Sequence, residues 1–209
     1  MSSRPASAPR PSARSGLIDA AHALVRKQGY AATSVDQICA AAGVSKGSFF
    51  HHFASKEALA AAAADEWTAR ADAMIFTDAP WMQHADPLDR LLAHIDFRAR
   101  LMDGPAEAFT CYVGTLVQES FATSESLRIA ANASLTAYAE RLAEDVAAAI
   151  DKYGAPAGIT AIGLAYHIQA VLQGAFILAK AKADPAIARE SAAHLKRYIE
   201  LLFKRSDLP

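Results

Sequence analysis

The sequence predicts an all-α protein with a small N-terminal head and a larger C-terminal helical body. Hydrophobic residues occupy 53% of the 209 positions, and many of them are alanine, the strongest helix former. No stretch shows the sustained alternation of β-branched and polar residues that predicts a strand. Capping residues and glycines divide the chain into apolar segments with helical spacing, and these mark the boundaries of the expected helices.

Residues 1–14 consist mainly of Ser, Pro, Ala and Arg, so they are expected to form a disordered basic arm with almost nothing to bury. Two interpretations are open for Arg4, Arg10 and Arg14: they are part of a solvated tail, or they contact DNA phosphates or a minor groove. The arm lacks the apolar stretch of a secretory signal. Two cysteines in the whole chain are typical of a reducing compartment, so a cytoplasmic location is expected.

The next segment, residues 15–62, is predicted to form a head of three helices. The first helix spans residues 15–28. Ser34 opens the second helix, where its hydroxyl can pair with Gln37 in a capping box. This helix is expected to end at Gly43, because glycine is the residue best suited to a left-handed C′ position.

Ser45 is expected to cap the third helix, residues 46–52. A helix, a short turn with glycine and a second helix that starts with small, polar and basic residues form a helix-turn-helix. Such a unit places the N-terminal end of its second helix in the DNA major groove. Gly47 and Ser48 leave room for close approach, and Lys46 adds positive charge. A helical corner in an ordinary all-α protein could show the same caps, so this motif alone leaves DNA binding open.

The charge distribution favours DNA binding. Residues 1–56 contain seven Lys or Arg and two acidic residues, a net charge of +5, whereas the rest of the chain has a net charge of −6. Phosphate contacts supply most non-specific affinity for DNA, so a basic head on an acidic body is expected of a DNA-binding protein.

The head also resembles the TetR/AcrR family of one-component transcriptional regulators. The resemblance lies in residues 29–30, 33–35, 43–53 and 55–59, and it is strong over roughly residues 15–62. It implies a dimeric regulator whose recognition helices read DNA and whose C-terminal domain binds a small molecule.

One residue departs from the family pattern. Where the family usually has tyrosine in the middle of the recognition helix, this chain has Phe50, which cannot donate a hydrogen bond to phosphate. His52, or the hydroxyls of Thr33 and Ser34, are expected to replace that contact. Lys56 matches the lysine of the family that faces the DNA backbone. The expected DNA-contact residues are Thr33, Ser34, Ser45, Lys46, Gly47, Ser48, Phe50, His52 and Lys56.

Residues 63–205 are predicted to form a ligand-binding and dimerisation domain. The helix capped by Ser55 is expected to run to about Phe76, and in the family it connects the head to this domain. Caps, prolines at the first helical position and terminal glycines predict the remaining helices. These run from Asp86-Pro87 to Asp103-Gly104, from Pro105 through Cys111, Thr115 and Leu116, from Ser124 to Gly154, and from Asp184-Pro185 onward.

Residues 153–179 contain no Asp, Glu, Lys or Arg and are long enough to cross a bilayer. Polar residues inside the stretch and the absence of a second span in the sequence favour a soluble helix instead, buried by its own core and by a partner chain. With the last helix, it resembles the dimer interface of the family. A homodimer through residues about 158–203 is therefore expected, without membrane contact. The expected buried face consists of Leu164, Ile168, Val171, Leu172, Ala175 and Ala179.

A small-molecule pocket is expected between the helices that begin near Asp86, Ser124 and Pro156. No metal site or cofactor is predicted, because the adjacent His51 and His52 point in different directions on a helix. The sequence also lacks a phosphate-binding loop, an HExxH motif and a nucleophile elbow, so an enzyme is not expected. The expected lining, chosen as aromatic, polar or reactive positions on apolar faces, is Phe97, Leu101, Cys111, Thr115, Tyr138, Leu142 and His167.

Cys111 and Lys180 carry a second hypothesis. Residues 110–119 and 172–181 are similar to a TetR subgroup with electrophile-sensing members, in which the matching cysteine and lysine lie near each other beside the cavity. A nearby ammonium group favours the thiolate, which is the reactive form. The alternative is that Cys111 is a small apolar filler and Lys180 a solvated residue. Cys39 is interpreted as a packing residue.

These features together predict a ligand-responsive DNA-binding regulator. The expected form is a homodimeric repressor, released from a palindromic double-stranded DNA operator by a small-molecule inducer. The alternative is a dimeric helical small-molecule-binding or interaction protein that does not bind DNA. Phe50 supports this alternative, because it cannot donate a hydrogen bond to phosphate. A DNA-binding assay at several salt concentrations separates the two.

Overall fold

The computed structural model describes residues 12–77 and 79–204. The prediction of an all-α fold is confirmed, and no strand occurs among these residues. The α-helices are α1 (Ala13–Gln28), α2 (Val35–Ala42), α3 (Lys46–His52), α4 (Lys56–Asp72), α5 (Pro87–Leu101), α6 (Ala106–Phe109), α7 (Tyr112–Ser120), α8 (Glu125–Tyr153), α9 (Ala161–Lys182) and α10 (Ala186–Leu202).

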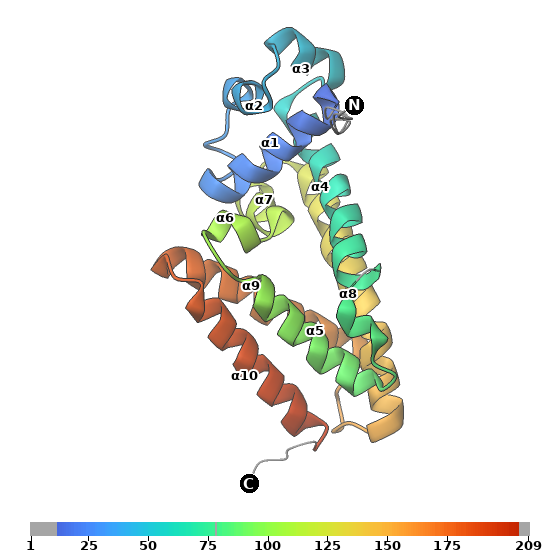
Figure 1. Cartoon of the computed structure of the whole chain (residues 1–209). Helices are drawn as coiled ribbons and strands as arrows, with labels where there is room; N and C mark the ends of the chain where they lie inside the picture. The colour runs from blue at the N-terminus through green and yellow to red at the C-terminus, as the bar shows by residue number, and fades with distance from the viewer. Residues whose placement is uncertain (1–11, 78, 205–209) are drawn as a thin grey trace, which may run out of the picture.

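The head forms at one end of the molecule, with α2 and α3 farthest from the C-terminus (Figure 1). The predicted capping box is present: Gln37 N–H donates to Ser34 Oγ at 3.2 Å, and Ser34 N–H donates to Gln37 Oε1 at 2.8 Å. Gly43 ends α2 with a left-handed backbone at a φ of 66°. The local chemistry of these residues therefore sets the turn between α2 and α3.

Residues from both regions form the core beneath the head. Leu17, Phe49 and Leu59 from the head are fully buried in one cluster with Tyr112 of α7 and Leu127 of α8. The Tyr112 hydroxyl donates to the Ala60 carbonyl at 3.2 Å. The head therefore packs directly on α7 and on the start of α8.

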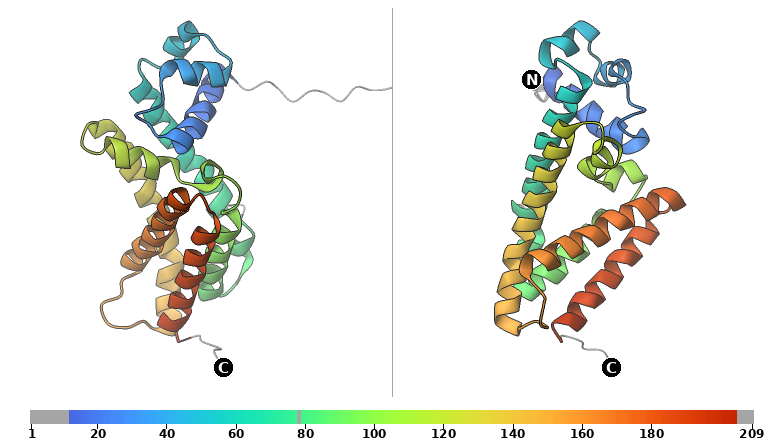
Figure 2. Two further views of the ribbon diagram at one scale, coloured as in Figure 1. Left: turned by 90° about the vertical axis from the view of Figure 1, so that its left-hand side faces the viewer. Right: turned by 180° about the vertical axis from the view of Figure 1, so that it is seen from behind.

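Two long helices connect the ends of the molecule. Helices α4 and α8 lie side by side along its length (Figures 1 and 2). The predicted boundary at residue 62 falls inside α4, so the two regions share this helix. After Asp72 the helix continues as a π-helix, η1 (Ala73–Thr77), which supplies Ile75 and Phe76 to the core of the body.

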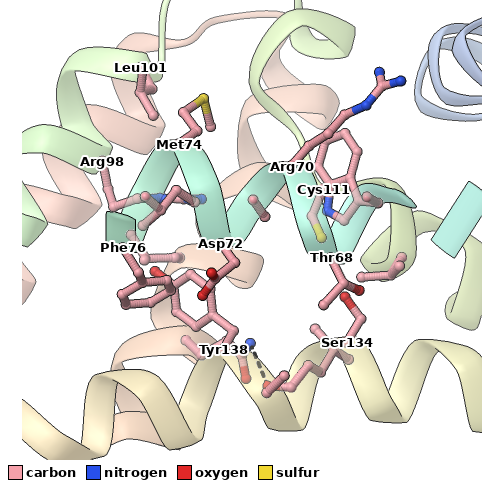
Figure 3. A pocket seen from close by; sticks show the side chains of 18 of the residues that line it. Thr68, Arg70, Asp72, Met74, Phe76, Arg98, Leu101, Cys111, Ser134 and Tyr138 are labelled. Carbon is pink, nitrogen blue, oxygen red and sulfur yellow. Dashed lines mark hydrogen bonds between the residues drawn. The ribbon is translucent and has the colours of Figure 1, made fainter. Parts of the chain in front are cut away.

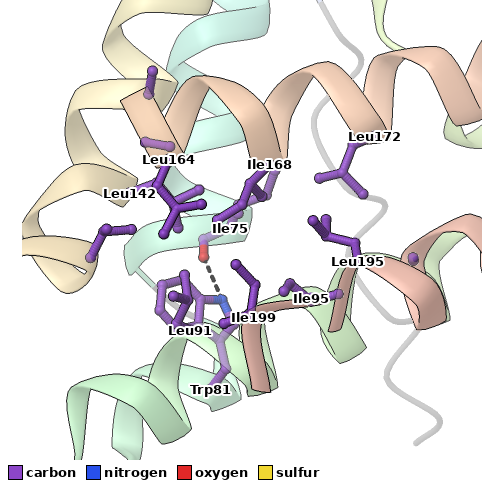
Figure 4. Close-up of a cluster of buried hydrophobic side chains, with 14 of the residues drawn as sticks. Ile75, Trp81, Leu91, Ile95, Leu142, Leu164, Ile168, Leu172, Leu195 and Ile199 are labelled. Atoms are coloured by element: carbon purple, nitrogen blue, oxygen red, sulfur yellow. Dashed lines mark hydrogen bonds between the residues drawn. The ribbon is translucent and has the colours of Figure 1, made fainter. Parts of the chain in front are cut away.

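The core of the body lies between α5, α8, α9 and α10. Figure 4 shows apolar side chains from these helices meeting around Trp81, which lies in a short 3-10 helix, η2 (Pro80–Gln83). The Trp81 indole N–H donates to the Ile75 carbonyl at 2.8 Å. This bond fixes the connection between α4 and α5.

Two predicted boundaries are wrong. Part of the expected arm is helical, since α1 begins at Ala13 after its cap Ser12; residues 1–11 of the arm lie outside the described residues. The single helix expected after Pro105 is broken, because Thr110 and Cys111 adopt extended backbone between α6 and α7. The Cys111 sulfur takes the place of a serine cap and accepts a hydrogen bond from Gly114 N–H at 3.4 Å.

The apolar face of α9 that the sequence predicts to be buried lies inside the protomer. Five of its six residues are buried in the core of the body, with Val171 partly buried against it, because α9 packs on α8 and α10 through this side. A different apolar face is exposed, with Ile162, Tyr166, Ile177 and Leu178 on α9 and Tyr198 and Leu201 on α10.

Helix α9 is the one helix among the described residues that is long and apolar enough to cross a membrane, with a mean hydropathy of 1.5. Its buried side belongs to the core of the body. This helix therefore gives only weak evidence for a membrane span.

Candidate functional site

Helix α3 is held by one face and exposes the other. Phe49 and Phe53, one turn apart, are buried in the head with ring centroids 6.1 Å apart. Gly47, Phe50 and His51 lie on the opposite side and are exposed, Phe50 by 53%. This free face lies at the end of the molecule and can enter a DNA groove without displacing any packed residue (Figure 1).

The start of α3 is polar and open. The Ser45 hydroxyl accepts a hydrogen bond from Ser48 N–H at 3.1 Å, and its own hydrogen stays available to a phosphate oxygen. Ser34 is exposed in the same way at the start of α2. Gly47 has no side chain to hold a phosphate away from the helix end, where the helix dipole favours negative charge.

Lys46 forms an exposed ion pair with Asp36 of α2, with its Nζ 2.9 Å from the Asp36 carboxylate. The hydrogen bond to Asp36 and the charge of Asp36 raise the pKa of Lys46, so the ammonium group is charged at neutral pH. Water and salt screen an exposed pair of this kind, so a DNA phosphate can compete with Asp36 for the ammonium.

Thr33 and Lys56 lie elsewhere than the sequence suggested. Thr33 is buried and its hydroxyl donates to the Gly29 carbonyl at 2.6 Å, so it closes the turn after α1 and is not free for DNA. Lys56 Nζ donates to the carbonyls of Tyr30 at 3.0 Å and of Thr33 at 2.9 Å, and burial lowers its pKa. Lys56 therefore ties α4 to that turn, with one N–H left for another partner.

His51 was missed as a candidate, whereas His52 was included. His52 is half-buried beside Phe53, with ring centroids 6.5 Å apart, and His51 points to solvent. The spacing could have shown this, because His51 lies two residues and about 200° around the helix from Phe49.

A cavity of about 790 Å³ lies where head and body meet. Helix α4 and η1 line it together with residues of α5, α8 and α9, and His22 and Arg26 of α1 reach it from the head. In Figure 3, Arg98 and Phe76 lie at one end of the cavity, and Cys111 and Thr68 lie at the other. The volume is within the usual range of small-molecule sites, about 300–1,000 Å³.

The structure places three of the seven predicted lining residues, Leu101, Cys111 and Tyr138, at this cavity. The helices expected to form the pocket do so, but α1, α4 and the connection from α6 to α7 also contribute. Leu142 is instead fully buried in the core of the body, and Phe97 packs against that core. The predicted residues outside the lining are Phe97, Thr115, Leu142 and His167.

Thr115 and His167 have other neighbours. Thr115 lies one turn after Cys111 and accepts a hydrogen bond from Lys180 Nζ at 3.0 Å. Burial lowers the pKa of Lys180, an effect that the negative charge of Glu119 opposes. His167 is exposed, with its ring 5.2 Å from that of Tyr198 on α10.

A buried histidine stands beside the cavity. His94 Nε2 lies 2.8 Å from the Tyr138 hydroxyl, and His94 Nδ1 has no partner among the described residues. Burial, together with the nearby charge of Arg98, lowers the pKa of His94 to about 3. The imidazole is therefore neutral at physiological pH, and its ring stacks on Phe76 at 5.7 Å.

Four arginines line the cavity, and three of them have polar partners. Arg26 donates to the carbonyls of His22 at 3.0 Å and Ala108 at 3.4 Å. Arg98 is the exception, since its buried Nε has no hydrogen-bond partner and it makes no ion pair among the described residues. The carboxylate pairs are Arg70 with Asp19 at 2.6 Å and Glu66 at 2.9 Å, and Arg141 with Asp72 at 3.5 Å and Glu144 at 3.2 Å.

Hydrogen bonds tie the head to the body around this cavity. Ala31 N–H, in the turn after α1, donates to Glu119 Oε2 on α7 at 2.8 Å. Gly29 has a φ of 91°, and a Cβ at that position would meet the Glu119 carboxylate. Within the head, His22 Nε2 lies 2.7 Å from the Ala63 carbonyl and joins α1 to α4. The head is therefore joined to α7 through the turn after α1, and α1 is joined to α4.

Comparisons with known proteins agree with this architecture. Residues 17–63 match the family described as bacterial regulatory proteins, tetR family, and residues 87–195 match the tetracyclin repressor-like C-terminal domain. The Transposon Tn10 TetC protein of Escherichia coli is 33% identical over 78 residues, which covers 37% of this chain and 40% of that protein.

Two solved structures share the fold over almost the whole chain. A TetR family transcriptional regulator from Agrobacterium tumefaciens is 22% identical, with a TM-score of 0.78 over 89% of this chain and 96% of that one. A TetR transcriptional regulator from Chloroflexus aurantiacus is 28% identical, with a TM-score of 0.77 over 90% of this chain and 93% of that one.

Proposed function

The chain belongs to the TetR family of bacterial regulatory proteins, and from that premise we propose that it is a homodimeric repressor released from a palindromic operator by a small molecule. It is a DNA-binding transcriptional regulator, as members of the family are, and not an enzyme. As such it works in solution in the cytoplasm.

The observation that carries the proposal is the composition of the cavity wall. Residues of α1 and α4, which hold the recognition helix, line the same cavity as residues of α5, α8 and α9. A ligand that fits best when α1 and α4 have shifted will favour that conformation by its difference in affinity for the two states. The shift changes the separation of two recognition helices, which must be about 34–36 Å apart to read successive major grooves.

We place the dimer interface on the exposed apolar face of α9 and α10. The substitutions suggested by the sequence, Ala175→Asp and Leu195→Asp, would put a charge into the core of one protomer and cannot test dimerisation alone. Ile177→Asp is better, because Ile177 is 51% exposed in the single chain. Sedimentation should show a dimer for the wild type and a monomer for Ile177→Asp. Phe121→Asp, at another exposed apolar site, should stay dimeric.

The DNA-contact residues in this proposal are those on the free side of the head. They are Ser34, Ser45, Lys46, Gly47, Ser48, Phe50 and His52 from the sequence, with His51 added. Lys56 is kept as a residue that positions the turn and has one N–H left for phosphate.

The test is binding of the purified protein to a library of palindromic DNA, followed by fluorescence anisotropy at several salt concentrations. Lys46→Ala should weaken binding to all sequences and reduce the salt slope by about one unit. Lys56→Ala should reduce the slope if Lys56 touches phosphate, or lower thermal stability with an unchanged slope if it only positions the turn. Absence of salt-dependent binding by the wild type would favour the alternative, a dimeric helical protein without DNA affinity.

A second candidate is covalent sensing at Cys111, which is supported by its place beside the cavity. Lys180 also lies nearby, since it donates a hydrogen bond to Thr115, one helical turn after Cys111. The expected result is faster alkylation of Cys111 than of the buried Cys39 at neutral pH, with loss of operator binding. If Cys111→Ser responds normally to the inducer, the cysteine serves as the cap of α7 and as packing.

A further inference from the structure

We propose that the cavity takes an organic carboxylate, with the anionic end on Arg98 and an apolar body among Phe76, Tyr138 and Phe176. This inference rests on the proposed ligand-responsive function and names the chemical class of the ligand. It starts from the one arginine of the cavity lining that the described residues leave without a polar partner.

The position of the Arg98 Nε atom is costly, because this donor is buried and no described residue accepts its hydrogen. A buried donor without a partner loses its hydrogen bonds to water and gains none in return, and the cost is greater for a charged group. The guanidinium lies 5.7 Å from the centroid of the Tyr138 ring and 6.0 Å from that of Phe176. The ring faces offset part of this cost by cation–π attraction, but they accept no hydrogen bond from Nε.

The other charges of the lining select against a cation. Asp19, Asp72 and Glu144 are already paired with arginines, and Glu140, the remaining carboxylate, is exposed. The unneutralised charge beneath the surface is therefore positive. A planar guanidinium matches a carboxylate with two parallel hydrogen bonds, which gives both strength and orientation.

The surroundings of Arg98 define the rest of the ligand. Phe76 and Tyr138 meet edge to face at 5.1 Å, and Phe109 lies 6.0 Å from Phe176. His94, whose pKa is lowered by burial and by the charge of Arg98, is neutral and joined to Tyr138, so it adds no second positive charge. Arg26, the other arginine of the lining without a carboxylate partner, already donates to two carbonyls, so Arg98 is the one lining arginine without a polar partner among the described residues. Such a cation beside several rings suits a single carboxylate on an aromatic or aliphatic body better than a phosphate dianion.

The probes for this proposal are decanoate, phenylacetate and naphthylacetate, each compared with its primary amide and its amine. Trp67 lines the cavity, so its fluorescence reports binding, and thermal unfolding provides a second measurement. At least one carboxylate should bind about tenfold or more tightly than its amide, as expected for hydrogen bonds to a charged group. The matching amine should be the weakest of the three.

Arg98→Met should abolish the preference for carboxylate over amide and still bind the amide. The matched control is Arg100→Met on the same helix, where the arginine is exposed and outside the lining. Arg98→Lys should keep part of the preference, since it retains the charge without the planar fork. Ligand-free Arg98→Met should unfold at the wild-type temperature or above, because it removes a buried donor, Nε, that has no partner among the described residues.

Two binding results would overturn the proposal: carboxylates that bind no better than amides, or a preference for carboxylate that survives in Arg98→Met. A clearly lower unfolding temperature of ligand-free Arg98→Met would also overturn it, because a purely structural role of Arg98 predicts that loss. Operator binding of the ligand-free protein, measured in parallel, keeps the two proposals apart. Carboxylate binding without DNA binding would refute the repressor, and DNA binding without carboxylate preference would refute only the anionic site.

Discussion

The interior of the head and the junction below it are packed in opposite ways. Beside Ile38 and Leu59 in the head lies a space of only about 10 Å³, whereas the junction encloses a cavity of about 790 Å³. The first region holds short helices in fixed positions, as a recognition helix requires. The second leaves room for a ligand and accepts an unpaired arginine. The size of the internal space thus separates the head from the region that we propose responds to a ligand.

Two leucine truncations test this contrast most directly. Leu59→Ala, fully buried in the head, should lower the free energy of unfolding by about 2–5 kcal/mol, because the filled core cannot close around the void. Leu101→Ala, half-buried at the cavity, should cost about 1 kcal/mol, since it only enlarges an existing space. Urea unfolding measures both variants. Equal losses would mean that the junction is as tightly packed as the head.

The same contrast explains how far sequence reasoning could reach. The head follows from local chemistry, since Ser34, Gln37, Gly43 and Ser45 act within a few residues of their own positions, and all four do what their spacing predicts. Thr33 was misjudged because its partner, the Gly29 carbonyl, becomes available only when the turn closes.

The cavity depends on contacts between helices that are far apart in the sequence. Helical spacing marks Leu142 as apolar, but only the packing of α5, α8 and α9 decides that it faces the core and not the ligand. Arg98 gave no signal in the sequence, because a lack of partners is a property of its surroundings. The exposed face of α9 was missed for a similar reason, since that helix is apolar on all sides.

A second prediction concerns pH, and it sets the junction apart from the surface of the body. The pKa of His94 is about 3 in the folded protein, against an ordinary value of 6.5. Between pH 6.5 and pH 3, His94 therefore binds a proton in the unfolded chain but stays neutral in the folded one. Stability is therefore lost as the pH falls below 6.5. Between about pH 7 and pH 5 the loss from this group should be on the order of 2 kcal/mol.

The measurement is denaturant unfolding of wild type and His94→Phe across this range. The variant should lose less stability than the wild type as the pH falls, whatever its stability at neutral pH. His194→Gln, at an exposed position on α10, should follow the wild type. Parallel curves for wild type and His94→Phe would show that His94 can be protonated inside the folded protein.

The third prediction weakens the link between the two regions. Glu119→Ala removes the carboxylate that accepts the Ala31 N–H, an exposed bond worth about 1 kcal/mol. Urea unfolding should show a loss of that size. If this contact transmits movement from the junction, the variant should keep its DNA affinity and need more inducer for release. An unchanged inducer response would mean that movement reaches the head through α4 and the rest of α1 instead.

The smallest effect is expected in the head itself, at Phe50, where the sequence resemblance predicts a tyrosine. Phe50 meets the buried Phe49 ring edge to face at 5.1 Å but is itself 53% exposed, so the hydroxyl that Phe50→Tyr adds can point to solvent without repacking the head. Stability should be unchanged within about 0.5 kcal/mol, as for most surface substitutions. If this residue faces a phosphate, the new hydroxyl should tighten operator binding by about 0.5–1.5 kcal/mol, a few-fold to about tenfold. The salt slope should stay the same, because no charge is added.

The control is His52→Gln, which changes the half-buried neighbour that the sequence offered as a substitute donor. A loss of affinity in His52→Gln that Phe50→Tyr restores would show that the two positions serve one phosphate. An unchanged affinity in Phe50→Tyr would place that side chain against a base edge or in solvent, and the head would then depend on its caps and on Lys46 for the DNA backbone.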